Sequence, residues 1–167
     1  MIGAGALELA PGFIEGPYDD SVLHARRIGA DEIAAVAAAG HPQIGKRLSP
    51  REVADHAIIM REPGSGTRAV VEQAYEGIGL KIEPLMSVSD TEAIKRMLVA
   101  RRAIAYVSTL SVKDELARGD LALLEVDGLR IERPLQMVWL KGRSLSPSAQ
   151  AFFDLVLASA IRDAAAA

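Results

Sequence analysis

The sequence feature that most constrains the fold is a regular alternation of apolar runs and helix-start signals between residues 49 and 140. At Ser49-Pro50-Arg51-Glu52, serine can cap a helix, proline suits its first position, and glutamate completes a capping box. Apolar runs suited to strands alternate with such helices at short intervals, which predicts a largely parallel sheet covered by helices. The expected strands are 57–60, 81–86, 103–107, 121–126 and 135–140, and the expected helices are 50–55, 67–77, one beginning near 90, and 111–118.

Further elements are expected on either side of this alternation. Phe13 and Ile14 form a short apolar run, and residues 22–39 are predicted as one long strand that ends at a glycine and a proline. The last helix is expected to begin at Ser146-Pro147. Trp139 lies in an apolar run and is expected in the core.

Charge and composition exclude several classes of protein. The 19 Lys and Arg residues against 22 Asp and Glu give a net charge of −3, and no basic run exceeds a pair, which disfavours direct nucleic-acid binding. The chain has no cysteine, which excludes disulfides, a thiol nucleophile and thiolate metal ligands. No apolar stretch approaches the roughly 18 residues of a membrane span, and no Lys or Arg precedes Arg26 as a secretory signal requires. We therefore expect a soluble, cytoplasmic protein without membrane contact.

The most informative segment is Arg61-Glu62-Pro63-Gly64-Ser65-Gly66-Thr67-Arg68, between an expected strand and an expected helix. Ligands of parallel α/β folds collect at this end of the sheet. A glycine-rich turn exposes backbone N–H groups, the helix N-terminus carries partial positive charge, and the hydroxyls of Ser65 and Thr67 add donors. The segment is therefore a candidate anion site, with Arg61 as a charged contact. The alternative is a tight turn in which Ser65 or Thr67 merely caps the helix.

Val88-Ser89-Asp90-Thr91 repeats this arrangement one strand and helix later, which would place a second helix N-terminus beside the first. Ser89 and Thr91 are the candidate contacts there. The alternative is again structural, because Ser89 and Glu92 fit a capping box. Asp90 would oppose an anion placed close to it.

Other kinds of site are weakly supported. Gly64-Ser65-Gly66-Thr67-Arg68-Ala69 matches the dinucleotide fingerprint G-x-G-x-x-A, but no acidic residue ends the next expected strand to hold a ribose. The histidines at 24, 41 and 56 are widely spaced, so they are expected as surface or loop residues and not as metal ligands. We predict no catalytic residue, no metal and no cofactor.

Several stretches together resemble the effector-binding (substrate-binding) domain of LysR-type transcriptional regulators. Their order and spacing fit this family from Leu7 to about Leu157. The Arg61–Arg68 string resembles most closely the branch that regulates carbon-fixation and sulfur-assimilation genes. The stretches are 13–17, 39–42, 61–68, 92–95, 103–108 and 146–153.

This resemblance implies a three-layer α/β fold of the periplasmic-binding-protein-like (type 2) kind, with a mixed, mostly parallel sheet. Two lobes would hold a small effector, and DNA would be read by an N-terminal winged helix-turn-helix. Residues 35–135 would form the complete second lobe, and 1–34 with 136–167 a remnant of the first. The DNA-binding domain and the opening of the first lobe have no counterpart here, so we expect a sensor truncated at its N-terminus.

The expected function is therefore an effector-sensing regulatory domain and not an enzyme. Its effector would be a small anionic metabolite contacted by Arg61, Ser65, Gly66, Thr67, Ser89 and Thr91. We also expect a homodimer or higher oligomer, because an incomplete first lobe would expose a sheet edge and the apolar side chains of Phe152 and Phe153. The alternatives are a solute-binding protein of a transporter and, less favoured, a nucleotide-using enzyme.

Overall fold

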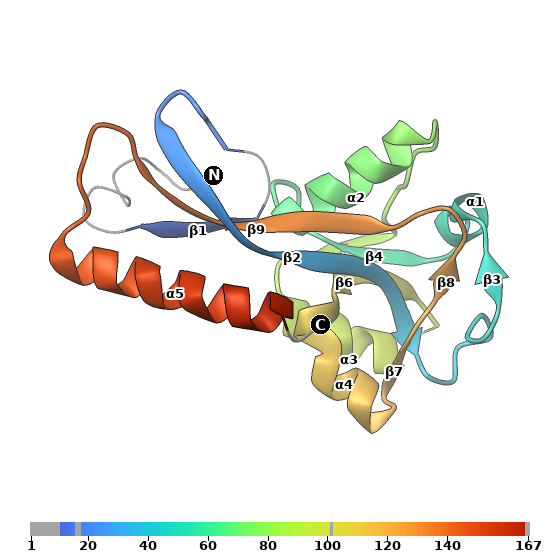
Figure 1. Ribbon diagram of the computed structural model, residues 1–167. Coiled ribbons are helices and arrows are strands. Elements are labelled where there is room, and N and C mark those ends of the chain that lie inside the picture. The colour runs from blue at the N-terminus through green and yellow to red at the C-terminus, as the bar shows by residue number, and fades with distance from the viewer. Residues whose placement is uncertain (1–10, 16–17, 101, 166–167) are drawn as a thin grey trace. The chain divides into compact units, whose positions relative to one another are not determined.

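The computed structural model describes residues 11–15, 18–100 and 102–165. The structure divides into two compact units, Met1–Ala30 with Arg133–Ala167 (unit 1) and Asp31–Glu132 (unit 2). Strands β2 (Leu23–Ala38) and β9 (Ile131–Leu140) each run from one unit into the other (Figure 1). The ends of the expected first lobe, 1–10 and 166–167, lie outside the described residues, and the lobe limits near 34 and 136 stay a prediction.

Unit 2 is built on a mixed sheet. Strand β6 (Ile104–Ser108) lies between β2 and β4 (Ile58–Arg61), and β5 (Met86–Val88) follows β4. Strand β4 is parallel to both β5 and β6, whereas β2 is antiparallel to β6 and to the short strand β7 (Leu121–Leu123). The predicted α/β class with parallel neighbouring strands is confirmed, and the antiparallel β2 makes the sheet mixed.

The helices of unit 2 follow its strands as predicted. They are α1 (Pro50–Ala54), α2 (Gly66–Gly77), α3 (Thr91–Ala100), the 3-10 turn η2 (Thr109–Val112) and α4 (Lys113–Arg118). The predicted capping box of α1 is present: the Ser49 hydroxyl accepts the Glu52 N–H, and the Glu52 carboxylate accepts the Ser49 N–H at 2.8 Å. These two hydrogen bonds satisfy the N–H groups of Ser49 and Glu52, which have no carbonyl partner inside the helix.

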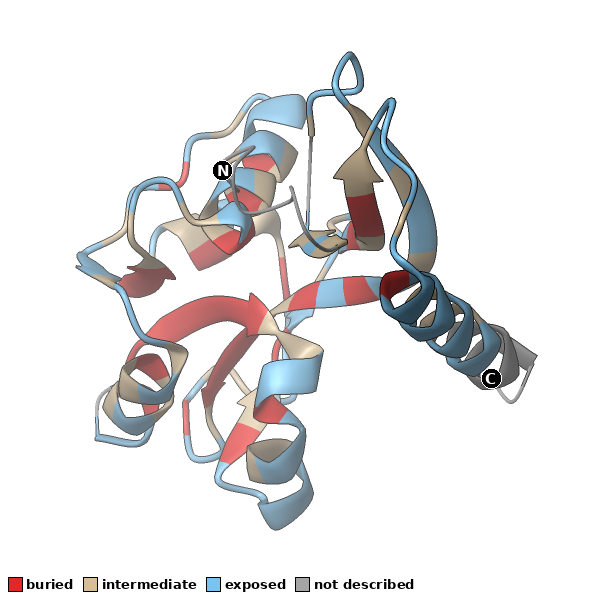
Figure 2. Ribbon diagram, turned by 90° about the vertical axis from the view of Figure 1, so that its left-hand side faces the viewer, coloured by how far each residue is buried: buried red, intermediate tan, exposed pale blue. Residues whose placement is uncertain are grey.

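Two apolar clusters cover opposite faces of this sheet and give unit 2 three layers. Side chains alternate along a strand, so Ile104 and Tyr106 of β6 join one cluster and Ala105 and Val107 join the other. Helices α1 and α2 pack on the first face, and α3 packs on the second. Figure 2 shows the buried residues along the strands and the exposed residues on the outer sides of the helices.

A buried pair of tyrosines joins α2 to the sheet. The hydroxyls of Tyr75 on α2 and Tyr106 on β6 are 2.8 Å apart, and their rings meet edge to face. Burial raises the pKa of both hydroxyls, so both stay protonated. The pair therefore fixes the position of α2 through a bond between two neutral groups.

Unit 1 contains β1 (Gly12–Glu15), the adjoining parts of β2 and β9, and α5 (Pro147–Ala165). Strand β1 pairs antiparallel with β9, and the buried Arg133 of β9 forms a 2.6 Å ion pair with Glu15 of β1. Phe13 and Phe152 contact each other but stay 50% and 45% exposed, which agrees with the expected exposure of Phe152. The expected exposure of Phe153 was wrong, because its ring packs against Trp139 and the residue is half-buried. No helix among the described residues is long and apolar enough to cross a membrane.

Several expected element boundaries were wrong. Strand β5 begins at Met86 and not at 81, because Pro84 has no N–H and ladder pairing with β4 begins only after it. The expected strand 121–126 is two strands, since β7 pairs with β2 while β8 (Glu125–Val126) pairs in parallel with the unpredicted β3 (Arg47–Leu48). Strand β9 begins four residues before the expected start, at Ile131.

Two predictions about burial also need correction. Trp139 is half-buried, and its ring contacts those of His24 and Phe153 in unit 1. His41 lies in a loop, as expected for a surface or loop histidine, but it is buried and not at the surface. Its Nδ1 accepts the Gln43 N–H at 3.3 Å, and its ring lies 5.9 Å from that of His56. Burial, together with the nearby His56 and Arg102 charges, lowers the pKa of His41.

This lowered pKa predicts a loss of stability in mild acid. Because the pKa of His41 is lower in the folded chain than the unfolded value of 6.5, the unfolded chain binds more proton as the pH falls past that value. The stability that His41 contributes is therefore complete above pH 6.5 and is lost as the pH falls toward the folded pKa. One proton gives a slope of at most about 1.4 kcal/mol per pH unit. Urea unfolding from pH 8 to pH 5 measures this slope. His41→Asn keeps an acceptor for Gln43 and should flatten it, and an unchanged slope would contradict the assignment.

Candidate functional site

The predicted contact residues gather at one edge of the unit 2 sheet. Strands β4, β5 and β6 are parallel, with Arg61 opposite Val88 and Ile59 opposite Ala105, so their carboxyl ends share an edge. Helices α2 and α3 and the turn η2 begin directly after these strands. The N-terminal ends of α2, α3 and η2 therefore lie at the same edge, and their free N–H groups carry partial positive charge there.

Arg61 ends β4 and is held on two sides. Its Nε and Nη2 donate to the two carboxylate oxygens of Glu62 at 2.8 and 3.0 Å, and its Nη1 donates to Thr91 Oγ1 at 3.2 Å. The bond to Thr91 joins the β4 side of the candidate site to the α3 side. The guanidinium holds the pKa of Glu62 below its usual range, so this carboxyl is ionised.

Arg68 is a residue of this edge that the sequence analysis did not select as a contact. From α2 its side chain reaches Glu72 at 2.7 Å, Ser87 Oγ of β5 at 2.9 Å and the carbonyl of Arg61 at 3.4 Å. It therefore ties the first turn of α2 to both β4 and β5. The i,i+4 spacing of Arg68 and Glu72 is visible in the sequence, but the bond to Ser87 is not.

The start of α2 is free of acidic residues. Ser65 occupies the N-cap position with extended backbone, but its side chain makes no capping hydrogen bond among the described residues. Gly64 has a φ of +91°, the left-handed conformation that glycine allows, and Thr67 is buried. This geometry leaves the helix N-terminus suited to an anion.

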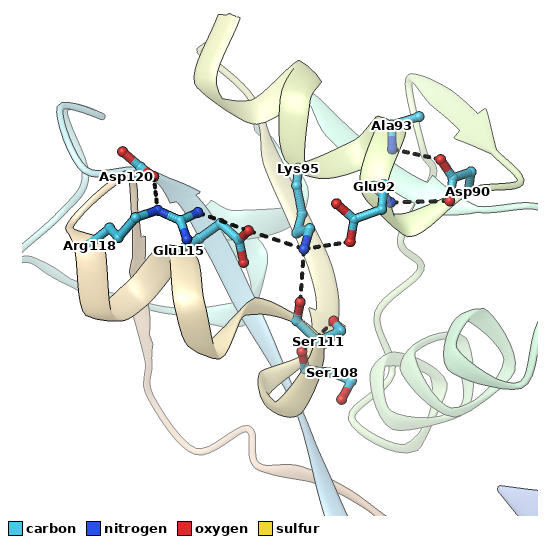
Figure 3. A network of polar contacts seen from close by, with 9 residues as sticks. All are labelled: Asp90, Glu92, Ala93, Lys95, Ser108, Ser111, Glu115, Arg118 and Asp120. Carbon is cyan, nitrogen blue, oxygen red and sulfur yellow. Dashed lines mark hydrogen bonds and ion pairs between the residues drawn. The ribbon is translucent and has the colours of Figure 1, made fainter.

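The start of α3 is different, and the expected capping box there was wrong. The helix begins at Thr91, so the capping residue is Asp90 and not Ser89. The two oxygens of Asp90 accept the N–H groups of Glu92 and Ala93 at 3.2 and 3.0 Å (Figure 3). A carboxylate on this helix end disfavours an anion there.

Lys95 fastens the loop after β6, which forms the third part of the edge. Its side chain is 11% exposed, and its Nζ contacts Glu92 at 2.6 Å, Glu115 at 3.2 Å and the Ser111 carbonyl at 3.1 Å (Figure 3). Ser108, at the end of β6, donates to Asp31 of β2 at 2.8 Å. These bonds connect α3, the η2–α4 segment and β2, so the polar groups at the edge are held by unit 2 itself.

Two pockets of unit 2 are lined by other residues. The larger, of about 460 Å³, is lined by residues of β2 and of the 124–131 segment together with Arg47 and Tyr106. The smaller, of about 320 Å³, lies beside His41 and Arg102. In the described part of the chain, neither is lined by a predicted contact residue. No three His, Asp or Glu side chains among the described residues are grouped so as to hold a metal ion.

The comparisons with known proteins agree on the kind of domain. The family model of the LysR substrate binding domain matches residues 4–160. The HTH-type transcriptional regulator CbbR of Xanthobacter flavus is 34% identical over 134 residues, which are 78% of this chain and 40% of that protein. The phosphonates import ATP-binding protein PhnC of Anaeromyxobacter dehalogenans is 34% identical over 157 residues, 92% of this chain and 31% of that protein.

A solved structure matches as well. The CcmR regulatory domain of Synechocystis PCC6803, in complex with 2-PG, has a TM-score of 0.85 at 26% identity, covering 94% of this chain and 76% of that one. The matched region spans at most about half the length of these curated relatives. The matched family model covers nearly the whole chain, and the mixed three-layer fold is the one the resemblance implied. This chain therefore belongs to the LysR substrate-binding domain family.

Proposed function

We propose that unit 2 binds a small anionic effector at the edge formed by Arg61, Ser65, Gly66, Thr67, Ser89 and Thr91. The observation that carries this proposal is the oriented guanidinium of Arg61, which donates to Thr91 at the start of α3. It lies at the same sheet edge at which α2 begins without an acidic residue in its first turn. A fixed guanidinium and converging backbone N–H groups are the usual elements of an anion site. Binding alone, without covalent chemistry or a cofactor, is the role proposed for this edge.

The charges at the edge suggest how the effector is oriented. Asp90 occupies the start of α3, so the anionic group belongs at the start of α2, near Ser65, Gly66 and Thr67. Ser89 and Thr91 would then contact neutral polar parts of the same molecule. The complex of CcmR with 2-PG supports a small molecule as the effector class.

The signal would pass on through assembly. We propose that effector binding shifts a homodimer or higher oligomer between two arrangements of different affinity. DNA contact would belong to a helix-turn-helix segment, as the names of HTH-type regulators such as CbbR indicate for those proteins. The exposed Phe13, Phe152 and Leu155 support self-association, and a monomer in light scattering at tens of micromolar would contradict it.

Thermal unfolding with a panel of ligands tests the proposed function. A ligand at a hundred times its Kd adds about 2.7 kcal/mol of stability, which shifts the melting temperature by several degrees for a chain of this size. We expect stabilisation by sulfate, inorganic phosphate or 2-PG, and none by NAD or ATP. Stabilisation by a nucleotide and not by small anions would contradict the proposal and favour the enzyme alternative.

A transport-linked role is the second candidate, and the similarity to PhnC is the observation that favours it. In that case the domain would sense a solute for an import system instead of controlling transcription. The same panel separates the two when it includes methylphosphonate. Stabilisation by the phosphonate, with no response to sulfate, phosphate or 2-PG, would favour transport.

A further inference from the structure

The anion site proposed above already contains an anion of the protein itself. Glu62 follows Arg61 directly, and its two carboxylate oxygens accept from Nε and Nη2 of Arg61, which is the paired geometry a bound oxyanion would use. Arg61 also donates to Thr91, so its guanidinium stays oriented whichever acceptor it holds. A ligand that seeks the same two donors must displace the Glu62 carboxylate.

The structure allows such a displacement. The Glu62 side chain is 38% exposed against 25% for Arg61, so the carboxylate can move into water while the guanidinium remains in place. Glu62 is the first residue of the glycine-containing turn, and its backbone carbonyl accepts the Ser65 N–H at 3.1 Å. Movement of its side chain leaves this backbone bond intact.

Resting on the proposed function of the edge, we propose that Glu62 is an internal competitor that an anionic effector must displace from Arg61. The contact keeps the guanidinium neutralised and oriented in the absence of ligand. It also favours oxyanions over halides as competitors, because two oxygens match the two parallel N–H donors of the guanidinium better than one spherical ion does. Glu62 would therefore select oxyanions and lower the affinity for all of them.

The first test compares the wild type with Glu62→Gln, using sulfate as the probe. Kd is measured from the amide chemical shifts of Gly66 and Thr67. Exposed or partly exposed ion pairs contribute up to about 1 kcal/mol, so removing the competing charge should tighten sulfate binding by about fivefold. Glu83→Gln is the matched control, because Glu83 pairs with Lys81 on an exposed segment and its loss changes the net charge equally. Its Kd should equal that of the wild type.

The outcomes separate this inference from the proposed function. Equal or weaker sulfate binding by Glu62→Gln, with shifts still at Gly66 and Thr67, overturns the competitor and leaves the site standing. An absence of shifts at these amides in both proteins overturns both proposals.

A second readout uses the wild type alone. Arg61 holds the pKa of the Glu62 carboxyl below its usual range. Saturating sulfate should release Glu62 and raise this pKa toward its ordinary value, as followed by carbon NMR of the carboxyl. A Glu62 pKa that sulfate does not change would overturn the exchange.

Discussion

Replacing Tyr106 by phenylalanine is expected to lower the free energy of unfolding by about 1–3 kcal/mol. The substitution leaves the Tyr75 hydroxyl buried without its 2.8 Å partner, and both residues are buried in the core cluster between α2 and β6. A buried hydroxyl that loses its partner retains the full penalty of leaving water. Urea unfolding at neutral pH measures the change.

The double variant Tyr75→Phe/Tyr106→Phe separates this cause from a loss of packing. It removes both hydroxyls and leaves no buried polar atom alone, so its cost should be smaller than the sum of the single changes. Tyr18→Phe, at a half-buried position of unit 1, is the control and should stay within about 0.5 kcal/mol of the wild type. Strictly additive single changes would show that the two hydroxyls do not stabilise each other.

Replacing Arg61 by methionine is expected to weaken sulfate binding by about 100-fold. Removing a charged group that holds an anion through paired hydrogen bonds costs about 2–5 kcal/mol of binding free energy, and Glu62 would then face the anion without a partner. The sulfate concentration that gives a fixed rise in melting temperature measures the effect. Arg51→Met removes the same charge from the exposed first turn of α1 and should leave sulfate binding unchanged.

The pair Arg61→Met/Glu62→Gln shows how much of this loss comes from the unpaired carboxylate. Sulfate binding should recover in part, because the repulsion is removed while the guanidinium is still missing. An unchanged affinity in Arg61→Met alone would remove Arg61 from the site.

Local features of the fold were predictable from the sequence because they depend on neighbouring residues. The Ser49–Glu52 capping box depends only on contacts within a few residues, and the end of the long strand β2 is marked by the glycine and proline that follow it. The glycine-rich turn before α2 is equally local, since Gly64 adopts a left-handed conformation that its residue type allows. The location of the candidate site followed from these features and from the direction of the parallel strands.

The remaining differences arise from contacts between distant segments. Strands β7 and β8 are separate because their partners, β2 and β3, lie far away in the sequence. The residues of the Arg68–Ser87 bond are 19 positions apart and those of the Tyr75–Tyr106 pair are 31 apart, so no local sequence pattern predicts these contacts. His41 became buried through packing against His56, although its Gly-His-Pro sequence is typical of an exposed turn.

The start of α3 shows how closely a helix boundary would have to be predicted to locate the site. Ser89 and Asp90 are both good capping residues, and a shift of the helix start by one residue decides between them. That shift places a negative charge, instead of a hydroxyl, on the helix end beside the site. It therefore changes where an anion can bind, although the fold itself is unaffected.

The most direct test of the central claim is an amide NMR map of the nitrogen-labelled chain titrated with sulfate. The account predicts that the largest shifts fall on Ser65, Gly66 and Thr67, with smaller ones at Ser89 and Thr91. Shifts concentrated instead around Arg47 and Asp127, or around His41 and Arg102, would place anion binding in one of the two pockets and contradict the assignment of the site to the edge of β4, β5 and β6.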